Sequence, residues 1–567
     1  MTNSIHLTTR LLALLLALLT LLFALVSCGG SGDDPAITAT AADPEPFDPE
    51  AVGTNIKTSA ALASGAPGLF WNNMDYKSGP YVGDPFILYD GGVFYLYGTT
   101  RRYVDPTKIV EGFEVYYSTD LINWKDGGAA FTPGKGDWCT DRLWAPEVYK
   151  IGDKYYMYYT GASGSYGVLH GSVAVADSPL GPFSNKVADG VNPRKPVFDF
   201  GSDFPTIDGT LFTDDDGSLY YFFVRDQIGD SASIGKDKSV RSTLWGIELE
   251  NPYTIKEGAS PVKLTEVGRS TVGEKGSFTQ KWERTQGLWN EGPFALKHDG
   301  KYYLTYSANA FTSKYYAIGY AVSDSPLGTY VKGSDAEIMG IDPTESSDRA
   351  YFAGTGHAMF LYIGSELFVV YHTLIPNTDT LRHFTIDRAG FRPDGSLYIN
   401  GPTLSAQPLP AEISGLENVA LGAPAFAKDA AGAETEIEGA EKLTDGEFDA
   451  LSATAGNAAK LPAGETSIVV DLGGVNDVSA VVVYNSADYD LSFTSVSNIT
   501  VGKYYSFDDV KVLEDSIDAK TKLIKAGSCA VLIFNKPVKA SSVTVTFNTD
   551  KPLAVSEIAV YRALPVR

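Results

Sequence analysis

Between about Leu69 and Ser405, short hydrophobic runs alternate with polar turns in a pattern that recurs five times. Each unit predicts one strand, a turn of Gly or Asp, and a second strand rich in aromatic residues. Successive second strands lie 60 to 82 residues apart, which leaves room for a four-stranded sheet in each unit. The recurrence predicts an all-β fold, a five-bladed β-propeller, and disfavours a series of β-sandwiches. The aromatic markers of the second strands are Tyr95, Tyr155, Tyr220, Tyr302 and Phe368.

After Pro410 the aromatic density falls and alanine becomes more frequent, which indicates a domain boundary near residues 410–416. Alternating hydrophobic and polar positions then predict a β-sandwich of the jelly-roll type. We therefore expect a propeller domain over residues 67–411 and a sandwich domain over residues 412–567. The alternating segments are 467–473, 480–484 and 542–547.

The N-terminus has the pattern of an export signal. Arg10 precedes the apolar run Leu11–Val26, which is shorter than the roughly 20 residues of a membrane-spanning helix. The run ends in Leu-Val-Ser-Cys28, which resembles a bacterial lipobox and implies a signal segment 1–28 and a lipid anchor on Cys28. Residues 29–66 predict a flexible tether. We expect a lipid-anchored protein of the bacterial cell envelope, at the outer membrane or cell surface; a soluble secreted protein is the alternative.

Composition narrows the function classes. A chain of 567 residues exceeds the roughly 250 to 300 residues at which single cores stop growing. Its net charge of -24 repels phosphate backbones and anionic lipids, so nucleic acid is not an expected partner. Besides Cys28, only Cys139 and Cys529 occur, in different predicted domains. Two ordinary buried thiols are therefore expected, rather than a disulfide framework or a Cys-based metal site.

Equivalent positions in the five units carry a distinctive set of side chains. In propellers the first strand of each blade lines the central axis, so equivalent residues converge there. Three carboxylates, a tryptophan and a histidine are then predicted to face one cavity. An unpaired inward carboxylate is costly to desolvate, so three together favour function over the alternative of solvated turn residues. Counting back eleven residues from the marker, or twelve in the third unit, reaches Asp84, Trp144, Asp208, Glu291 and His357.

Two carboxylates across a cleft suit the hydrolysis of a glycosidic bond, because one protonates the departing oxygen while the other activates water or attacks the sugar. The third can adjust a neighbour's pKa. Metal binding by these oxygens is the rival use, but the sequence has no H-E-x-x-H, Cys pair or facial-triad spacing. It also lacks G-x-S-x-G, a P-loop and a G-x-G-x-x-G after a strand, so serine acyl transfer and nucleotide chemistry are unsupported.

An ordered set of motifs over about 340 residues resembles glycoside hydrolase family 43. The resemblance implies a five-bladed propeller hydrolase that inverts anomeric configuration and needs no cofactor for its chemistry. Matched residue by residue, it implies Asp84 as general base, Asp208 as the carboxylate that tunes pKa and orients the acid, and Glu291 as general acid. The motifs are Gly83-Asp84-Pro85, Trp144-Ala145-Pro146-Glu147, Ile207-Asp208-Gly209, Phe212–Gly217, Glu291-Gly292-Pro293 and Gly356-His357.

The residues themselves favour the same division of roles. Glu291 lies among Trp289, Pro293 and Phe294, and apolar surroundings raise a carboxyl pKa by desolvation. Asp84 should stay ionised to accept a proton from water. Inversion predicts that the two carboxyl groups lie about 6.5 to 9.5 Å apart, whereas a separation near 5 Å would indicate retention.

Other residues are candidates for substrate or metal binding. Trp144 and Trp289 could offer indole faces to a sugar, or could simply pack between blades. His357 is by default a lone core histidine, but the resemblance implies an axial position near calcium or another cation. Arg382 follows Tyr371-His372 where relatives keep an arginine near the sugar; a surface arginine is the alternative. The acidic run 214–217 favours a hairpin turn over a calcium loop.

The C-terminal segment resembles the discoidin-like jelly roll, which includes carbohydrate-binding module family 32. The resemblance implies that Asp445 and Glu557 match positions that often hold a structural calcium. Glycan binding and simple packing against the propeller remain alternative roles for this domain. The segments that carry the resemblance are 418–420, 443–446, 470–473 and 555–558.

The leading hypothesis is an inverting glycosidase that acts on arabinose- or xylose-containing plant polysaccharides or oligosaccharides, such as an α-L-arabinofuranosidase or β-xylosidase. The pentose preference comes from the family resemblance alone. An endo-arabinanase is the nearest enzymatic alternative. A surface glycan-binding lipoprotein without catalysis is the alternative from another class, and the presence of all three acidic residues disfavours it.

Overall fold

The computed structural model describes residues 80–564 except 100–101, 106–107, 111, 165–166, 227–241, 334–336, 341–353, 375–381, 404–406, 449–456, 487–495, 503–510 and 513–528. Before residue 80 it describes only residues 55–56, 70–71 and 73. The predicted signal segment with Cys28, and all of the tether except residues 55–56, therefore lie outside the described residues. In the described part of the chain, no helix combines the length and the apolar character needed to cross a membrane.

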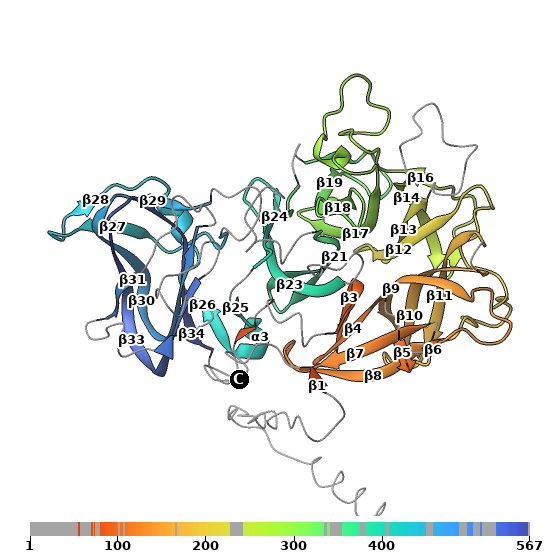
Figure 1. Ribbon diagram of the computed structural model, residues 1–567, viewed down its shortest axis with the longest axis horizontal. Coiled ribbons are helices and arrows are strands. Elements are labelled where there is room, and N and C mark those ends of the chain that lie inside the picture. The colour runs from red at the N-terminus through yellow and green to blue at the C-terminus, as the bar shows by residue number, and fades with distance from the viewer. Residues whose placement is uncertain are drawn as a thin grey trace, which may run out of the picture. The chain divides into compact units, whose positions relative to one another are not determined.

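Five antiparallel sheets follow one another along the chain, and each contains one of the predicted aromatic second strands (Figure 1). The first two sheets are the most N-terminal. Blade 1 is β1 (Asn55–Ile56), β8 (Trp124–Phe131), β7 (Phe113–Ser118), β4 (Val93–Thr99) and β3 (Gly83–Asp90), and blade 2 is β11 (Leu169–Ala176), β10 (Lys154–Ala162) and β9 (Asp141–Ile151). A small hairpin, β5 (Arg102–Asp105) with β6 (Lys108–Val110), lies between β4 and β7 in the chain.

The next three sheets have four or five strands each. Blade 3 is β12 (Thr206–Thr213), β13 (Leu219–Asp226), β14 (Ser242–Asn251), β15 (Thr254–Ile255) and β16 (Val262–Lys263). Blade 4 is β17 (Asn290–His298), β18 (Lys301–Ala308), β19 (Ala317–Ser323) and β20 (Val331–Lys332), and blade 5 is β21 (Gly356–Ile363), β22 (Glu366–Leu374), β23 (Arg382–Phe391) and β24 (Leu397–Asn400). A 3-10 turn, η1 (Trp282–Arg284), precedes β17.

The first strands of the blades form a closed ring. Strand β3 contacts β9, β9 contacts β12, β12 contacts β17, β17 contacts β21, and β21 contacts β3 again. The strand pair β2 (Phe70–Trp71) with β25 (Gln407–Pro408) further joins the two ends of this region. The predicted five-bladed propeller is therefore confirmed, and its innermost strands surround the axis.

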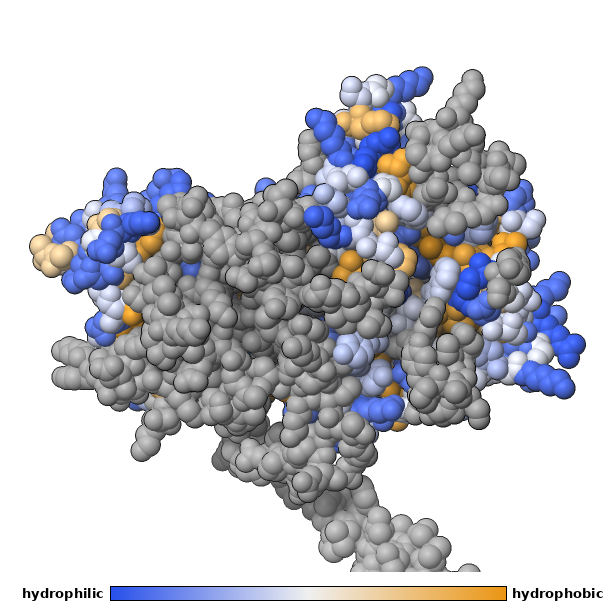
Figure 2. Space-filling view, viewed as in Figure 1, coloured by the Kyte–Doolittle hydropathy of each residue, from blue (hydrophilic) through white to orange (hydrophobic). Residues whose placement is uncertain are grey.

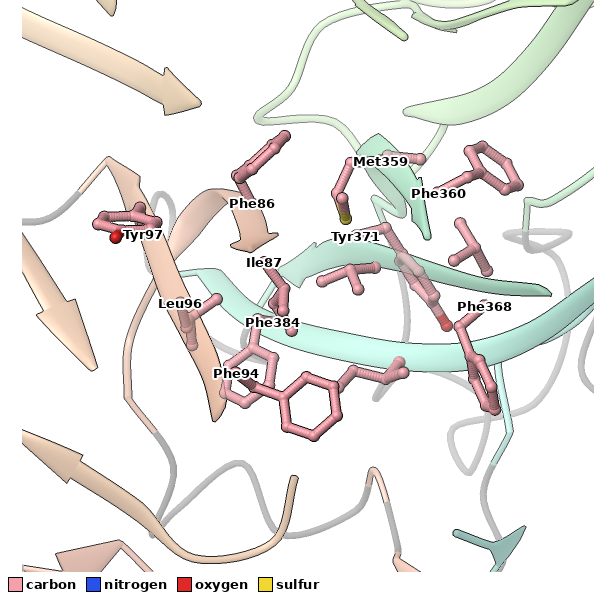
Figure 3. Close-up of a cluster of buried hydrophobic side chains, with 14 of the residues drawn as sticks. Phe86, Ile87, Phe94, Leu96, Tyr97, Met359, Phe360, Phe368, Tyr371 and Phe384 are labelled. Atoms are coloured by element: carbon pink, nitrogen blue, oxygen red, sulfur yellow. The ribbon is translucent and has the colours of Figure 1, made fainter. Parts of the chain in front are cut away.

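The aromatic second strands supply the core of the propeller. Strand β4 contributes the completely buried Phe94 and Leu96, and β22, which is buried on both faces, contributes Phe368 and Tyr371. Figure 3 shows residues of blade 1 and blade 5 packed together in one hydrophobic cluster, which closes the ring. Because burying such a side chain contributes about 1.5–3 kcal/mol, the aromatic excess noted in the sequence is explained largely by these contacts.

Each innermost strand is interrupted at the same place by a β-bulge. The pairing register with the second strand shifts there, and in each blade one residue adopts a left-handed backbone conformation with φ between 45° and 53°. These left-handed residues are Asp84, Ala145, Asp208, Gly292 and His357. The sequence register was therefore wrong by one residue in blades 2 and 4, because Trp144 and Glu291 precede the left-handed residue instead of occupying its place.

Two smaller expectations are confirmed. The acidic run at 214–217 forms the turn between β12 and β13, in which the Gly217 N–H donates to the Asp214 carbonyl at 2.9 Å. Cys139 and Cys529 are both buried thiols. On the face seen in Figure 2, hydrophilic side chains cover most of the coloured surface at the outer edges, consistent with a largely solvated set of charges.

Among the described residues of the C-terminal region, strands dominate and α3 and η3 are short helical turns, as expected for a sandwich. Its strands share one sheet system with two long, bent strands, β30 and β33. Its core differs from that of the propeller in residue types. It is rich in Val, Ile and Ala, for example Val481, Val483 and Val545. The elements are α3 (Ala411–Ser414), η3 (Ala440–Leu443), β26 (Leu416–Asn418), β27 (Ala425–Asp429), β28 (Glu434–Thr435), β29 (Ala459–Leu461), β30 (Gly464–Asn485), β31 (Val496–Val501), β32 (Lys511–Val512), β33 (Cys529–Thr549) and β34 (Leu553–Ala563).

Candidate active site

The bulges of the innermost strands bring the predicted acidic residues together at the axis. The charges of Asp84, Asp208 and Glu291 affect one another's pKa values. The charge of His357 affects the pKa of all three. A left-handed conformation costs energy in a residue other than Gly, so it persists where the surrounding structure enforces it, commonly at functional sites. Asp84, Asp208 and His357 all carry this strain. The three predicted carboxylates and the histidine therefore form one cluster.

Asp84 is surrounded by cationic and hydrogen-bonding groups. The Arg382 guanidinium donates to Asp84 Oδ1, and His357 Nδ1 lies 3.2 Å from the same oxygen. Burial by itself would raise the pKa of Asp84, but Arg382, His357 and His372 hold it well below its ordinary value. This carboxyl group is therefore ionised, the state required of a group that accepts a proton.

Glu291 has the opposite surroundings. Only 9% of the residue is exposed, and its carboxyl receives one weak hydrogen bond, from the Tyr316 hydroxyl at 3.3 Å. Burial, together with the negative charges of Asp208 and Asp226, raises the pKa of Glu291 well above its ordinary value, although His357 partly opposes the shift. A carboxyl group in such a site stays protonated near neutral pH and can donate a proton.

Asp208, on the first strand of blade 3, is the third carboxylate of the cluster. Its own backbone N–H donates to the Thr160 hydroxyl at 2.9 Å, and its Oδ2 accepts from the Gly292 N–H at 3.1 Å. Burial raises the pKa of Asp208, while His357 and the Gly292 N–H act in the opposite direction. Gly292 is the residue after Glu291, so this bond links Asp208 directly to the backbone that carries the Glu291 side chain.

His357 is not an isolated core histidine. It is buried, its Nδ1 faces the Asp84 carboxylate, and its backbone N–H donates to the Ser307 hydroxyl at 2.7 Å. Burial would lower the pKa of His357, but Asp84, Asp208 and Glu147 raise it to about 9. His357 is therefore a cation within an acidic cluster, which reduces the repulsion between the carboxylates.

Arg382 is not a surface arginine. Its side chain is 13% exposed and packs against the backbone of Gly83, where a Cβ atom would lie 2.3 Å from its Cζ. The ring of Phe311 covers the guanidinium, with 5.1 Å between Cζ and the ring centroid. Phe311 itself is 39% exposed. An exposed aromatic face therefore lies next to the Arg382–Asp84 pair.

The two candidate tryptophans differ. Trp144 is half-buried and packs against the apolar cluster that contains Ala162, Leu169 and Ile207. Trp289 is also half-buried, but it belongs to none of the hydrophobic clusters among the described residues. It lies over Gly287, where a Cβ atom would come within 1.9 Å of the indole ring. Packing against the apolar cluster explains most of the burial of Trp144. Trp289 is better placed to present an indole face to a ligand.

A second buried glutamate lies close to Glu291 but has a different role. Glu283 is fully buried and accepts two hydrogen bonds of 2.7 Å from the Lys332 ammonium. The Lys332 ammonium also donates to the side-chain oxygen of Asn290 at 3.1 Å, immediately before Glu291. The Lys332–Glu283 ion pair therefore stabilises the start of β17. The positive charge of Lys332 is directed at Glu283.

Asp445 and Glu557 meet in the C-terminal domain. Glu557 is 1% exposed; its Oε2 accepts from the Gly446 N–H at 3.4 Å, and its Oε1 has no hydrogen-bond partner. Burial and the neighbouring Asp445 raise the pKa of Glu557 well above its ordinary value. Within the described residues, no group of three or more His, Cys, Asp or Glu side chains is arranged as metal ligands, either here or at His357.

Sequence reasoning missed several members of the cluster. His372 accepts the Asp84 N–H at its Nδ1 over 3.2 Å, and Tyr316 contacts Glu291. Glu147 is buried at the axis and accepts from the Tyr149 hydroxyl at 2.5 Å, and burial raises its pKa to about 7. Glu147 belongs to the motif Trp144-Ala145-Pro146-Glu147, so the sequence did offer a signal for this carboxyl group. His372 meets Asp84 only because blade 5 closes against blade 1, and Tyr316 lies just before β19 in the same blade as Glu291; neither residue had a local signal in the sequence.

Comparison with known proteins identifies the family of the propeller region. Residues 81–397 match the family model described as "Glycosyl hydrolases family 43". A β-D-galactofuranosidase of Aspergillus niger is 24% identical over 52% of this chain and 78% of its own length, and a β-xylosidase of Xylanibacter ruminicola is 27% identical over 45% and 73%. A solved thermostable family-43 glycoside hydrolase is 34% identical, covers 58% of this chain and 96% of its own, and has a TM-score of 0.48.

The fold and the comparisons define a β-propeller glycosidase, an enzyme that hydrolyses O-glycosyl bonds. The family match spans more than half of the chain and includes all three acidic residues. The chain belongs to glycosyl hydrolases family 43.

Proposed function

We propose that this enzyme hydrolyses glycosidic bonds with inversion, using Asp84 as general base, Asp208 as the residue that tunes and orients the acid, and Glu291 as general acid. The observation that carries the proposal is the contrast between the two outer carboxyl groups. Asp84 is paired with Arg382 and His357, whereas no ion pair to Glu291 is found within the part of the chain that the structure describes, and burial raises the pKa of Glu291. One group is thereby ready to accept a proton and the other to donate one.

The reaction then needs one water molecule and no covalent intermediate. Asp84 removes a proton from water as the oxygen attacks the anomeric carbon, and Glu291 gives its proton to the departing oxygen. The charge of Asp208 keeps Glu291 protonated until that step. Trp289, Phe311 and Arg382 are the proposed sugar contacts, with the aromatic faces against C–H groups and the guanidinium toward hydroxyls. Trp144 contributes mainly through packing.

We propose arabinose- or xylose-containing plant polysaccharides and oligosaccharides as the substrates. Support comes from relatives named β-xylosidase, xylosidase/arabinosidase and exo-α-(1→5)-L-arabinofuranosidase. The test is a screen of nitrophenyl α-L-arabinofuranoside, β-D-xyloside and β-D-galactofuranoside together with arabinan and xylan. Release of a monosaccharide supports an exo-acting enzyme, a rapid fall in arabinan viscosity supports an endo-arabinanase, and inactivity on every pentose substrate contradicts the proposal.

Replacement of Glu291 by Gln separates an enzyme from a glycan-binding protein. Gln keeps the shape of the side chain but cannot supply the proton, so hydrolysis of polysaccharide should be lost while oligosaccharide binding, measured by calorimetry, is retained. Undiminished hydrolysis by this variant would overturn the acid assignment. Binding without hydrolysis by the natural chain would support a non-catalytic surface protein.

We also propose that the C-terminal domain, residues 412–567, is a discoidin-like module that holds calcium through Asp445 and Glu557. The Glu557 oxygen without a hydrogen-bond partner, next to a second acidic side chain, fits a cation. Calcium there would neutralise the buried Glu557 carboxylate together with the exposed Asp445. Calcium added to chelator-treated protein should raise the melting temperature, and Glu557→Gln should abolish that rise; an equal rise in the variant would contradict the site.

Glycan binding by this domain is tested by affinity electrophoresis in arabinan gels with and without calcium.

We further propose that residues 1–28 are a lipoprotein signal and that Cys28 anchors the enzyme to the cell envelope at the outer membrane or cell surface. The support is the lipobox-like sequence before Cys28 and the tether-like composition that follows. Labelling of cells with a fatty-acid probe should mark the natural protein and leave the Cys28→Ser variant unlabelled. A labelled variant would contradict the anchor.

A further inference from the structure

Hydrogen bonds between neighbouring blades form a nearly complete ring around the axis. Each bond runs from the backbone N–H of the left-handed bulge residue to a side chain on the second strand of the preceding blade. The acceptor occupies the same position in each case. It lies on the second strand, opposite the first-strand residue that immediately precedes the bulge of the acceptor's blade. The four bonds are Ala145 N–H to Thr99 Oγ1 (2.8 Å), Asp208 N–H to Thr160 Oγ1 (2.9 Å), His357 N–H to Ser307 Oγ (2.7 Å) and Asp84 N–H to His372 Nδ1 (3.2 Å).

The ring is broken at one junction, between blades 3 and 4. The equivalent accepting position there is Val224, which pairs across the sheet with Ile207 and is completely buried. A valine side chain cannot accept a hydrogen bond, so the N–H of the next bulge residue, Gly292, has no acceptor on that strand. It donates to the Asp208 carboxylate instead, at 3.1 Å.

We propose that Val224 is a positioning residue for catalysis: because it lacks the acceptor that the other blades have, the Gly292 N–H is left to fix Asp208 beside Glu291. The inference rests on the proposed roles of Asp208 and Glu291. A buried N–H must find an acceptor, because leaving it unpaired is costly. Removing the local acceptor therefore directs this donor to the one carboxylate that adjusts the acid, and no separate side chain is needed to hold Asp208.

The bond has an electrostatic as well as a geometric consequence. It favours the ionised form of Asp208, whose charge is otherwise affected by His357, Asp84 and Arg382. The Asp208 charge in turn acts on Glu291, which also faces Asp226, His357, Asp84 and the Tyr316 hydroxyl. Loss of the bond should make Asp208 less ionised, so Glu291 would release its proton at a lower pH. The alkaline limb of kcat/KM should then move toward lower pH.

The test compares Val224→Ser with Val224→Ala in the full-length enzyme. Both variants remove similar volume from the core, but only serine restores an acceptor of the kind that Ser307 provides in blade 4. Serine competes for the Gly292 N–H, so kcat should fall about tenfold to a hundredfold relative to the alanine variant, as expected for a misplaced catalytic group. KM should change much less, and the alkaline limb should move only in the serine variant.

Val224→Thr serves as the second variant, since it keeps the valine shape and should reproduce the serine result. Thr99→Val is the matched control: it removes an acceptor at the junction of blades 1 and 2, where the donor is Ala145, and should leave the alkaline limb in place with kcat changed less than about threefold. Equal kcat and equal pH limbs in Val224→Ser and Val224→Ala would overturn the inference. Glu291→Gln tests the proposed roles separately from this inference, because undiminished hydrolysis of oligosaccharides by that variant would refute the roles themselves.

Discussion

The two ends of the acidic cluster are built from similar backbone and have opposite electrostatics. Asp84 in blade 1 and Glu291 in blade 4 both lie at the bulge of an innermost strand. Asp84 contacts Arg382 and His357, whereas Glu291 contacts the neutral Tyr316 hydroxyl and lies near the negative charges of Asp208 and Asp226. The fold supplies equivalent positions, and the neighbouring side chains decide which carboxyl group is ionised.

Glu283 shows that burial alone does not make a glutamate an acid catalyst. It is more deeply buried than Glu291, but Lys332 forms an ion pair with it and three further groups donate hydrogen bonds to it. Those contacts supply hydrogen-bond partners to both carboxylate oxygens of Glu283. Glu291 lacks them, so its burial raises its pKa and keeps its proton available.

The largest expected effect is that of Asp84→Asn. Removal of the proton acceptor should lower kcat about 10⁴-fold, at the upper end of what general base catalysis contributes. The loss should be similar for nitrophenyl glycosides and for oligosaccharides, because both substrates need the same activated water, whichever group departs. Steady-state kinetics with both substrate types check this, and a loss that varies with the leaving group would contradict the base role.

Glu291→Gln should give a loss that depends on the leaving group. A nitrophenolate departs without protonation, so kcat should fall about 10²-fold or less on nitrophenyl glycosides and about 10⁴-fold on oligosaccharides. The comparison uses the same two substrates as for Asp84→Asn. Equal losses on both substrates would show that Glu291 does not protonate the departing oxygen.

The same two substitutions should change stability in opposite directions. The raised pKa of Glu291 means that stability is lost as pH rises above the ordinary glutamate value of 4.5, so Glu291→Gln should stabilise the fold at pH 8. The depressed pKa of Asp84 contributes stability above pH 3.8 that is lost at lower pH, so Asp84→Asn should destabilise the fold. Denaturant titrations measure both changes, and the same sign for both would contradict the comparison.

Arg382→Gln should give the smallest of these effects on the chemistry. Without the guanidinium, the pKa of Asp84 rises, so the acid limb of kcat/KM should move up by about one pH unit while the alkaline limb stays in place. Substrate affinity should also fall. Arg392→Gln, at an arginine that pairs with Glu447, is the control and should leave both limbs unchanged. An unmoved acid limb in Arg382→Gln would show that Arg382 does not hold the base ionised.

The sequence was sufficient for the fold because the propeller repeats. Five aromatic strands at regular spacing fixed the number of blades, and the acidic residues could be found by counting from Tyr95, Tyr220 and Tyr302. The count went wrong by one residue at Trp144 and Glu291, since bulges change the register without changing the hydrophobic pattern.

The partners of the acidic residues could not be predicted in this way. His372 and Arg382 lie almost 300 residues from Asp84 in the chain and meet it only because blade 5 closes against blade 1. The contact between Asp208 and the Gly292 N–H likewise joins two blades, 84 residues apart. Ionisation states depend on such contacts, so the sequence indicated which carboxyl groups matter, and the structure was needed to explain how their pKa values differ.

The most direct test of the central claim is the configuration of the first product. Proton NMR of a hydrolysing pentoside, followed within the first minute before mutarotation, identifies the anomer released. An ionised Asp84 that activates water predicts the anomer opposite to that of the substrate, accumulating first and then equilibrating. Initial release of the anomer with the substrate's own configuration would mean that a carboxylate attacks the sugar, and would contradict the assignment of Asp84 as a general base.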